Sequence, residues 1–164
     1  MTVIGLDARP SMRHKRQMPI TEAILLETLR HSILLPIGVV HAVAQDELMS
    51  KYLLPKGTHV VMNIGHIFRN PEYFPDPESF KPDRFLKDGV FVKDDRVIGF
   101  GTGKRTCPGE PIALVETFLY SVELVRQFNI KAPPGHKCNT EGMIGSIQRI
   151  PKSDPLDVIF EKIQ

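Results

Sequence analysis

The chain has 164 residues, a length typical of one domain. Its 21 Lys and Arg residues nearly balance its 19 Asp and Glu residues, which excludes the strongly basic surface of a nucleic-acid-binding protein. Two cysteines are too few for a disulfide scaffold, and the longest charge-free stretch, residues 31–45, is shorter than the roughly 18 apolar residues of a membrane span. We therefore expect a soluble, globular, intracellular chain that contains no signal peptide or transmembrane segment.

The first nineteen residues are mostly polar and basic and predict a solvated connection. Residues 20–34 contain neither Gly nor Pro and end just before Pro36, which predicts a helix. Apolar side chains fall almost all the way round it, a pattern typical of a helix buried inside a larger structure. Glu27 and Arg30 are spaced to lie on one face of the helix. Spacing alone fits an exposed ion pair and a buried structural node equally well.

Short strands and turns are expected between this helix and a second one. Residues 37–44 are apolar and β-branched and predict a strand, with residues 58–64 as its antiparallel partner. Residues 70–85 contain four prolines, which predicts a packed meander with one short helix at most. The second helix is expected over about residues 108–128, and residues 156–163 predict a closing strand.

The most informative loop surrounds Cys107, with three glycines shortly before it and Gly109 after it. Such a loop lets backbone N–H groups converge on one point, because glycine tolerates positive φ and close approach. We place Cys107 at the N-cap of the second helix and Pro108 at its first position, where the helix dipole favours an ionised sulfur. Arg105 adds a cation. The pattern predicts a sulfur that acts as a nucleophile or a metal ligand.

The residues alone leave several roles open for this sulfur. A nucleophile needs an adjacent base, which only a distant His41 or His66 could provide. Zinc needs several ligands at close spacing, whereas Cys138 lies 31 residues away and no CxxC pair is present. An axial haem ligand needs one thiolate, because the porphyrin supplies four further donors. An inert structural cysteine is as well supported as a haem ligand.

Three motifs, in the same order along the chain, resemble those of the cytochrome P450 monooxygenases. The family's cysteine-ligand loop is matched at Phe100, Gly103, Arg105, Cys107 and Gly109. Residues 27–30 resemble its ExxR motif, and residues 82–85 resemble its PERF motif with Asp83 in place of the usual Glu. The resemblance runs from about residue 5 to the C-terminus and points to the microsomal animal enzymes that oxidise drugs and steroids.

The resemblance implies a mainly α fold with small β-sheets, of the α+β class. Residues 1–164 would form the C-terminal portion of a single haem-thiolate domain, an incomplete cytochrome P450 fold that lacks the family's N-terminal and central helices. The implied reaction inserts one atom of dioxygen into a lipophilic organic substrate. The implied cofactor is haem b, iron protoporphyrin IX, with electrons from NADPH through a flavoprotein reductase. The implied location is the cytoplasmic face of the endoplasmic reticulum membrane, held by an N-terminal anchor missing from this chain, with no nucleic-acid partner.

The resemblance also assigns roles to individual residues. Cys107 would be the axial ligand of the haem iron. The other haem-binding residues would be Phe100 beneath the ring, Arg105 and His41 on the propionates, and Gly103, Gly109 and Ala113. A buried structural triad would consist of Glu27, Arg30 and Arg84. Apolar candidates for the substrate pocket are Ile37, Val39, Val40, Ile144 and Ile147.

Two functional hypotheses follow from the resemblance. The first is a haem-dependent monooxygenase, of which this chain is the C-terminal portion. The alternative is a truncated and catalytically inactive haem-loop fragment, because the family's distal oxygen-activating residues are not in this sequence and no catalytic residue is therefore assigned. A zinc- or thiol-based domain is a remote third hypothesis. Substrate, regiochemistry and the choice between monooxygenase and isomerase chemistry depend on the distal helix and are not predicted.

Overall fold

A computed structural model describes residues 3–5, 8–135 and 158–163 of the chain. The helices in these residues are α1 (Met12–Lys15), α2 (Pro19–Ser32), α3 (Ile64–Arg69), α4 (Glu110–Gln127) and the 3-10 helices η1 (Pro82–Phe85) and η2 (Gly103–Arg105). The strands form antiparallel pairs: β1 (His41–Ala42) with β4 (His59–Val60), β2 (Glu47–Met49) with β3 (Tyr52–Leu54), β5 (Leu86–Lys87) with β6 (Val90–Phe91), and β7 (Phe128–Lys131) with β8 (Ile159–Lys162). This mixture of helices and small sheets agrees with the predicted α+β class.

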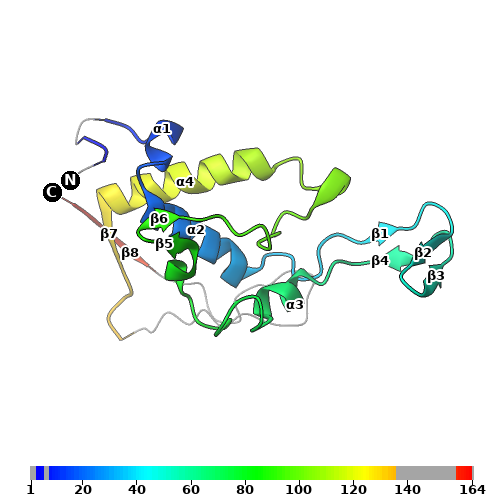
Figure 1. Cartoon of the computed structure of the whole chain (residues 1–164). Helices are drawn as coiled ribbons and strands as arrows, with labels where there is room; N and C mark the ends of the chain where they lie inside the picture. Colours follow the sequence, from blue (N-terminus) through cyan, green and yellow to red (C-terminus); the bar gives the residue numbers. More distant parts are fainter. Residues whose placement is uncertain (1–2, 6–7, 136–157, 164) are drawn as a thin grey trace.

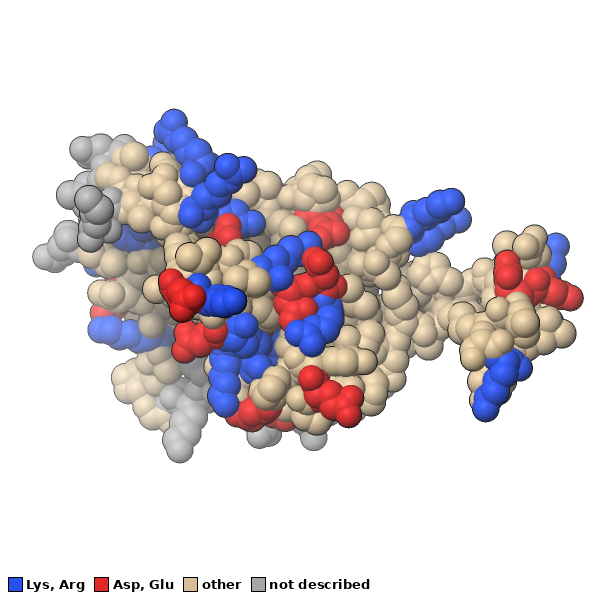
Figure 2. Space-filling view, viewed as in Figure 1, with Lys and Arg blue, Asp and Glu red and all other residues tan. Residues whose placement is uncertain are grey.

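The two long helices, α2 and α4, lie together at the centre of the body (Figure 1). α2 also packs against η1 and the β5–β6 hairpin, and α1 packs against both long helices. The β1–β4 pair and the β2–β3 hairpin form an arm that extends away from the body (Figure 1). Basic and acidic side chains intermix over the body in the view of Figure 2. None of the helices in the described residues is long and apolar enough to span a membrane.

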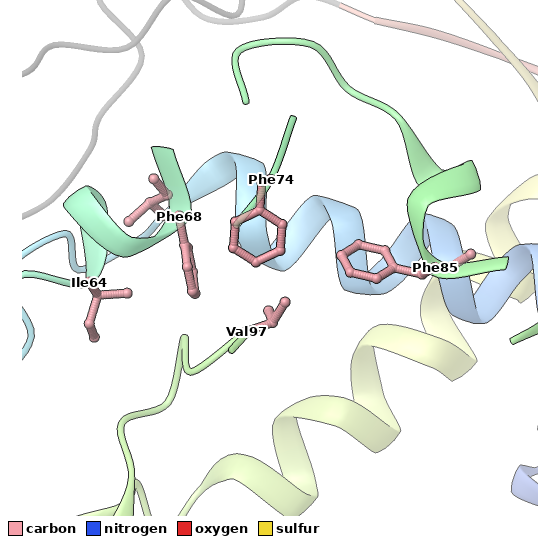
Figure 3. Close-up of a cluster of buried hydrophobic side chains, with 7 residues drawn as sticks. Ile64, Phe68, Phe74, Phe85 and Val97 are labelled. Atoms are coloured by element: carbon pink, nitrogen blue, oxygen red, sulfur yellow. The ribbon is translucent and has the colours of Figure 1, made fainter. Parts of the chain in front are cut away.

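The main core lies where α2 meets α3, the meander and the segment that leads to Cys107. Phe68, Phe74 and Phe85 form a row of buried aromatic side chains along α2, and Phe68 meets Phe74 edge-on with ring centroids 6.3 Å apart (Figure 3). Ile64 and Val97 pack beside this row. The proline-rich meander is therefore anchored by its aromatic residues, and η1 is its one short helix, as the sequence predicts.

A second core corrects the interpretation of residues 1–19 as a solvated connection. Ile4 is buried against Phe118 and Val122 of α4. The Arg126 side chain donates to the Gly5 carbonyl over 3.0 Å, which fixes this N-terminal segment to the same helix. Ile4 is therefore anchored to α4, although Val3 and Gly5 beside it are exposed.

The helix expected at residues 20–34 is α2, which ends earlier because Ile33 adopts a left-handed backbone with φ 41°. Its buried residues are Ala23, Glu27 and Arg30, whereas Ile20 and Ile24 are exposed. Within the described residues α2 is thus buried on one face, and burial of its other sides in a larger structure stays a prediction. The face of α2 that is most deeply buried is the one that carries the charges.

The strand expected at residues 37–44 is reduced to β1, and its predicted antiparallel partner is β4. Ile64 belongs to α3 rather than to the strand, because the Asn63 side chain accepts a hydrogen bond from the His66 N–H and caps a helix there. The closing strand is β8, which pairs with β7 immediately after α4. The start of the strand expected at residues 156–163 lies partly outside the described residues.

Candidate functional site

Glu27 and Arg30 form a buried ion pair on α2. The Arg30 Nε and Nη2 atoms each donate to one oxygen of the Glu27 carboxylate over 2.7 Å, and both side chains are fully buried. The Lys81 backbone N–H and the Arg84 Nε atom also donate to Glu27 Oε1, over 2.8 Å and 3.2 Å. Two-point pairing of a guanidinium with a carboxylate is the strongest form of such a contact. Of the two arrangements open from spacing, the structure shows the buried node.

The remaining donors of the node bind backbone carbonyl groups. Arg30 donates to the Phe68 carbonyl over 2.9 Å, and Arg84 donates to carbonyl groups of the meander over 3.1 to 3.3 Å. Every buried side-chain nitrogen and oxygen of the described residues has a hydrogen-bond partner. Burial acts to raise the pKa of Glu27, but the hydrogen bonds from Arg30 and Lys81 and the charges of Arg30 and Arg84 outweigh it and lower the pKa. The node is thus a satisfied, charged structural centre.

The loop before α4 brings the Cys107 backbone against Phe100. Gly101 and Gly103 have φ values of 82° and 71°, a region in which residues with a Cβ are strained, and Gly103 is the first residue of η2. The Cys107 N–H then donates to the Phe100 carbonyl over 2.8 Å and closes the loop. The chain reverses within seven residues, so that Phe100 and Cys107 lie together.

The predicted N-cap position of Cys107 is wrong. Gly109 is the N-cap of α4, Glu110 is its first residue, and Pro111 follows. Pro108 and Gly109 instead form a turn, in which the Glu110 N–H donates to the Cys107 carbonyl over 3.2 Å. A turn forms here because proline and glycine both favour it over an added helical turn. Cys107 therefore lies three residues before the first residue of α4, with the Pro108–Gly109 turn between them.

A cavity of about 720 Å³ opens beside this loop. Four of the residues assigned to the haem site line it, although they are far apart in the sequence: His41, Phe100, Arg105 and Cys107. Of the substrate-pocket candidates, Val39 and Val40 line the same cavity. The structure thus brings a sulfur donor, a cation and an imidazole together around one largely apolar space.

Other assigned residues support the loop rather than line the cavity. Gly109 lies behind the cysteine, since a Cβ there would be 3.6 Å from Cys107 Sγ. The Ala113 N–H donates to the Gly109 carbonyl over 2.9 Å in the first turn of α4, and Gly103 begins η2 with a positive φ of 71°. Ile37 is half-buried and does not line the cavity. Ile144 and Ile147, like Cys138, lie outside the described residues.

Sequence reasoning missed several residues of the cavity wall. Leu29 of α2, Ile33 at the end of that helix, Met62, Phe68 of α3 and Gly99 all line it. The spacing of Leu29 and Ile33, four residues apart in the helix expected at residues 20–34, could have placed these two on one face. Met62 and Gly99 carry no local signal, because their part in the wall depends on which segments meet in the fold.

The cavity fits a haem better than a protein-ligated metal ion. Its volume is in the range of sites for cofactors and small molecules, and most of its lining is apolar. A haem needs one axial sulfur, which Cys107 offers, and its carboxylates need polar or cationic partners, which Arg105 and His41 offer. Within residues 3–5, 8–135 and 158–163, no group of three or more His, Cys, Asp and Glu side chains is arranged to hold a metal ion.

Comparison with known proteins decides the family. A family model described as cytochrome P450 matches residues 1–156. The chain belongs to the cytochrome P450 family. It is 38% identical to cytochrome P450 2U1 of Bos taurus over 144 residues, which are 87% of this chain and 26% of that protein. It is also 38% identical to human cytochrome P450 2C8 over 153 residues, which are 92% of this chain and 31% of that protein.

An insect relative shows the breadth of the family. The chain is 33% identical to farnesoate epoxidase of Bombyx mori over 156 residues, which are 94% of this chain and 29% of that protein. The chain spans about a quarter of the length of the curated relatives it matches first. Cytochromes P450 are haem-dependent monooxygenases that take electrons from a redox partner and use a cysteine thiolate ligand. The family inferred from the three motifs is confirmed.

Proposed function

We propose that this chain forms the proximal side of the haem site of a cytochrome P450 monooxygenase, with Cys107 as the axial ligand of the iron. The observation that carries the proposal is that Cys107, Arg105 and His41 line one largely apolar cavity. When bound there, haem b would supply the activation of dioxygen that a monooxygenase requires. The chain's own residues bind and orient it.

The residues that line the cavity or support its loop would bind different parts of the haem. Cys107 Sγ would hold the iron, and Phe100 would pack against the ring beside the sulfur. Arg105 and His41 would each bind a propionate, since a guanidinium and an imidazole both donate hydrogen bonds to carboxylates. Gly103, Gly109 and Ala113 would let the loop and the start of α4 approach the porphyrin closely.

The node of Glu27, Arg30 and Arg84 would have an architectural role. It joins α2 to the meander through buried, fully paired charges, and α2 in turn supplies Leu29 to the cavity wall. Loss of the node would disturb the cavity without removing any group that touches the haem. We assign it no chemical step.

The substrate would be lipophilic, because the candidates for its pocket are apolar. Val39 and Val40 line the cavity and are exposed, and Ile37 lies just before them. Ile144 and Ile147 remain sequence-based members of this set. In the whole protein, apolar side chains at this point would receive a hydrophobic molecule next to the haem.

The family also suggests the domain, electron donor and membrane location of the whole enzyme. Residues 1–164 would be the C-terminal portion of one haem-thiolate domain. Electrons would come from NADPH through a flavoprotein reductase, and the whole enzyme would act at the cytoplasmic face of the endoplasmic reticulum membrane, held by an N-terminal anchor. These features rest on the family and its microsomal members.

A second candidate function is haem binding without turnover by the 164-residue chain itself. The observation that favours it is the exposed apolar rim of the cavity, where Leu34, Val39 and Val40 are 65%, 64% and 49% exposed. A rim of this kind leaves bound haem open to water, whereas monooxygenase chemistry needs a site from which water is excluded. The two candidates share the same haem ligand.

Spectroscopy of the chain titrated with hemin tests the ligand. We expect a thiolate-type Soret band in the ferrous–carbonyl difference spectrum of the wild-type chain, and its loss in Cys107→Ser. Cys138→Ser is the matched control, because it removes the chain's other cysteine, and it should keep the band. A Cys107→Ser chain with an unchanged band would overturn the assignment and leave a zinc- or thiol-based role for the sulfur.

A turnover assay separates the two candidates once the ligand is established. The hemin-loaded chain is mixed with NADPH, a microsomal P450 reductase and a lipophilic test substrate, and product is measured against NADPH consumption. Product formation supports a working enzyme. A thiolate-type spectrum together with no product supports haem binding without turnover.

A further inference from the structure

Arg96 lies between β6 and the Cys107 loop and forms a two-point ion pair with Asp94. Its Nη2 atom donates to Asp94 Oδ2 over 2.6 Å, and its Nε atom donates to Oδ1 over 2.9 Å. The Arg96 backbone N–H also donates to Oδ1 over 2.9 Å, so one carboxylate holds both the side chain and the backbone of Arg96. The hydrogen bonds from the Arg96 side chain hold the pKa of Asp94 below its ordinary value. The guanidinium is therefore fixed in orientation, although half of the Arg96 side chain is exposed.

The fixed guanidinium lies over two aromatic rings of the meander. Arg96 Cζ is 5.8 Å from the ring centroid of Tyr73 and 5.3 Å from the ring centroid of Phe74. A cation within about 6 Å of a ring centroid is attracted by the negative face of the ring. Phe74 is buried, and Arg30 Cζ lies 5.4 Å from the same ring centroid. Arg96 thus joins the segment before the Cys107 loop to a ring that also contacts the buried node.

A run of backbone turns connects Arg96 to Cys107. The Ile98 N–H donates to the Arg96 carbonyl over 3.0 Å, and the Gly101 N–H donates to the Ile98 carbonyl over 2.8 Å. The Cys107 N–H then donates to the Phe100 carbonyl, which belongs to the residue before Gly101. Each turn shares residues with the next one, so the backbone direction at Arg96 decides where the Cys107 loop begins.

Val97, the residue after Arg96, anchors the same segment in a different way. Its side chain packs in the main core beside Phe74 (Figure 3). Burial of an apolar side chain holds a segment against the core but is non-directional. The planar guanidinium of Arg96, paired with Asp94 at two points, adds a contact of defined geometry. Arg96 therefore provides the orientation that Val97 does not.

We propose that Arg96 is a positioning residue of the haem site: lying over Tyr73 and Phe74, it fixes the start of the Cys107 loop and with it the place of Cys107 Sγ in the cavity wall. This inference rests on the proposed haem ligand. Arg96 is not among the described residues that line the cavity, so it acts through the backbone and not by contact with haem. Loss of Arg96 should leave a folded chain in which Cys107 is less well placed for the iron.

Three variants of the full 164-residue chain test this role: Arg96→Met, Arg96→Lys and Tyr73→Leu. The matched control is Lys93→Met, because Lys93 is a cation of the same segment whose ion pair with Asp95 is exposed on both sides. Each chain is saturated with hemin below its unfolding temperature, and bound haem with a thiolate-type ferrous–carbonyl band is measured against bound haem without it.

The ratio of thiolate-type to other bound haem is the decisive measurement. We expect Arg96→Met to lower it about two- to fivefold, the effect of losing one cation–π contact, and Lys93→Met to leave it unchanged. We expect an intermediate ratio for Arg96→Lys, since lysine keeps the charge but not the two-point pairing. A residue that only stabilised the fold would lower the unfolding temperature and leave this ratio unchanged. Equal ratios for Arg96→Met and Lys93→Met would therefore overturn the proposal.

Tyr73→Leu decides the question if Arg96→Met does not fold. It keeps the ion pair between Arg96 and Asp94 but removes one of the two rings beneath the guanidinium. Tyr73 is 43% exposed, so its loss leaves the main core intact. We expect the ratio of thiolate-type to other bound haem to fall by about twofold. A ratio equal to that of Lys93→Met would overturn the proposal.

Hydrogen exchange of the hemin-free chain separates this inference from the proposed function. If the wild-type chain gives no thiolate-type band, the haem ligand is refuted, and exchange then tests the positioning by itself. We expect faster exchange in Arg96→Met at the Gly101 and Cys107 N–H groups, which close the turns of the loop, and unchanged exchange in the β2–β3 hairpin. Exchange equal to that of Lys93→Met would overturn the positioning role, as would faster exchange throughout the chain.

Discussion

The charged node lies on α2, and Leu29 of the same helix lines the cavity, yet the node and the cavity differ in how completely their groups are covered. Glu27 and Arg30 are fully buried, and all their charges are paired within the described residues. The cavity is bordered by Leu34 and Val39, which are exposed by about two thirds of their surface. The polar node is thus closed within the described residues, whereas the apolar cavity is open at its border.

The contrast follows from the cost of leaving each kind of group unpartnered. A buried charge without its partner is strongly destabilising, so its partners must be supplied close by in the same fold. Exposed apolar surface costs free energy in proportion to its area and can be covered by a cofactor or by further chain. Variants of the node should therefore act mainly on folding, and variants of the cavity mainly on haem.

The largest effect is expected for Glu27→Ala, which leaves Arg30 buried without its carboxylate. We expect a loss of about 3–5 kcal/mol in the free energy of unfolding, and no uptake of hemin. Urea unfolding and hemin titration measure the two effects. Glu116→Ala, on the exposed surface of α4, is the control and should change stability by less than about 0.5 kcal/mol. A stability loss below about 1 kcal/mol for Glu27→Ala would show that the node is not essential.

A smaller loss is expected for Arg84→Lys, which tests the outer half of the node. Lysine keeps the positive charge but cannot reach Glu27 and the meander carbonyl groups at once, as the fork of Arg84 does. We expect about 1–2 kcal/mol, from the hydrogen bonds that are lost. Urea unfolding measures this loss in the free energy of unfolding. The control is Lys87→Arg, an exchange of one basic residue for another on the exposed surface of β5. Equal stability of Arg84→Lys and the wild type would mean that charge alone matters here.

Acid should weaken the node progressively. The pKa of Glu27 is lower in the folded chain than its ordinary value, so the stability it contributes is fully present above about pH 4.3 and is lost as the pH falls through the folded pKa. The effect is smaller than deletion, because a protonated carboxyl keeps its shape and part of its hydrogen bonding. The measurement is the stability difference between the wild type and Glu27→Gln from pH 7 to pH 3. We expect it to be constant near neutral pH and to shrink below pH 4; a constant difference throughout would contradict the shift.

The smallest effect on folding is expected for Arg105→Gln, in the cavity. Arg105 is exposed, so the unfolding free energy should change by less than about 0.5 kcal/mol. Hemin affinity should nevertheless fall by about two- to fivefold, since an exposed ion pair with a propionate contributes up to about 1 kcal/mol. Lys104→Gln is the matched control: it lies in η2 beside Arg105 but does not line the cavity. Equal hemin affinity of the two variants would remove Arg105 from the haem site.

Much of the fold could be predicted because its signals are local. The Gly- and Pro-free run that forms α2, the proline-dense meander and the helix after Cys107 each depend on residues close together in sequence. Several shorter elements, such as α3 and the β2–β3 hairpin, could not be predicted. α3, for instance, begins where Asn63 caps it and is fixed by the Gly65 N–H, which donates to the distant Pro36 carbonyl over 2.7 Å.

The sequence by itself determined the family, since the spacing of Glu27 to Arg30, residues 82–85 and Phe100 to Cys107 is visible without any fold. The tertiary structure decided whether Glu27 and Arg30 are buried, because the Lys81 N–H and the Arg84 side chain reach them only after the meander packs on α2. It also decided the cavity wall, where Leu29 meets Gly99. Spacing reports which groups are available, whereas burial and contact depend on segments that are distant in sequence and meet only in the folded chain.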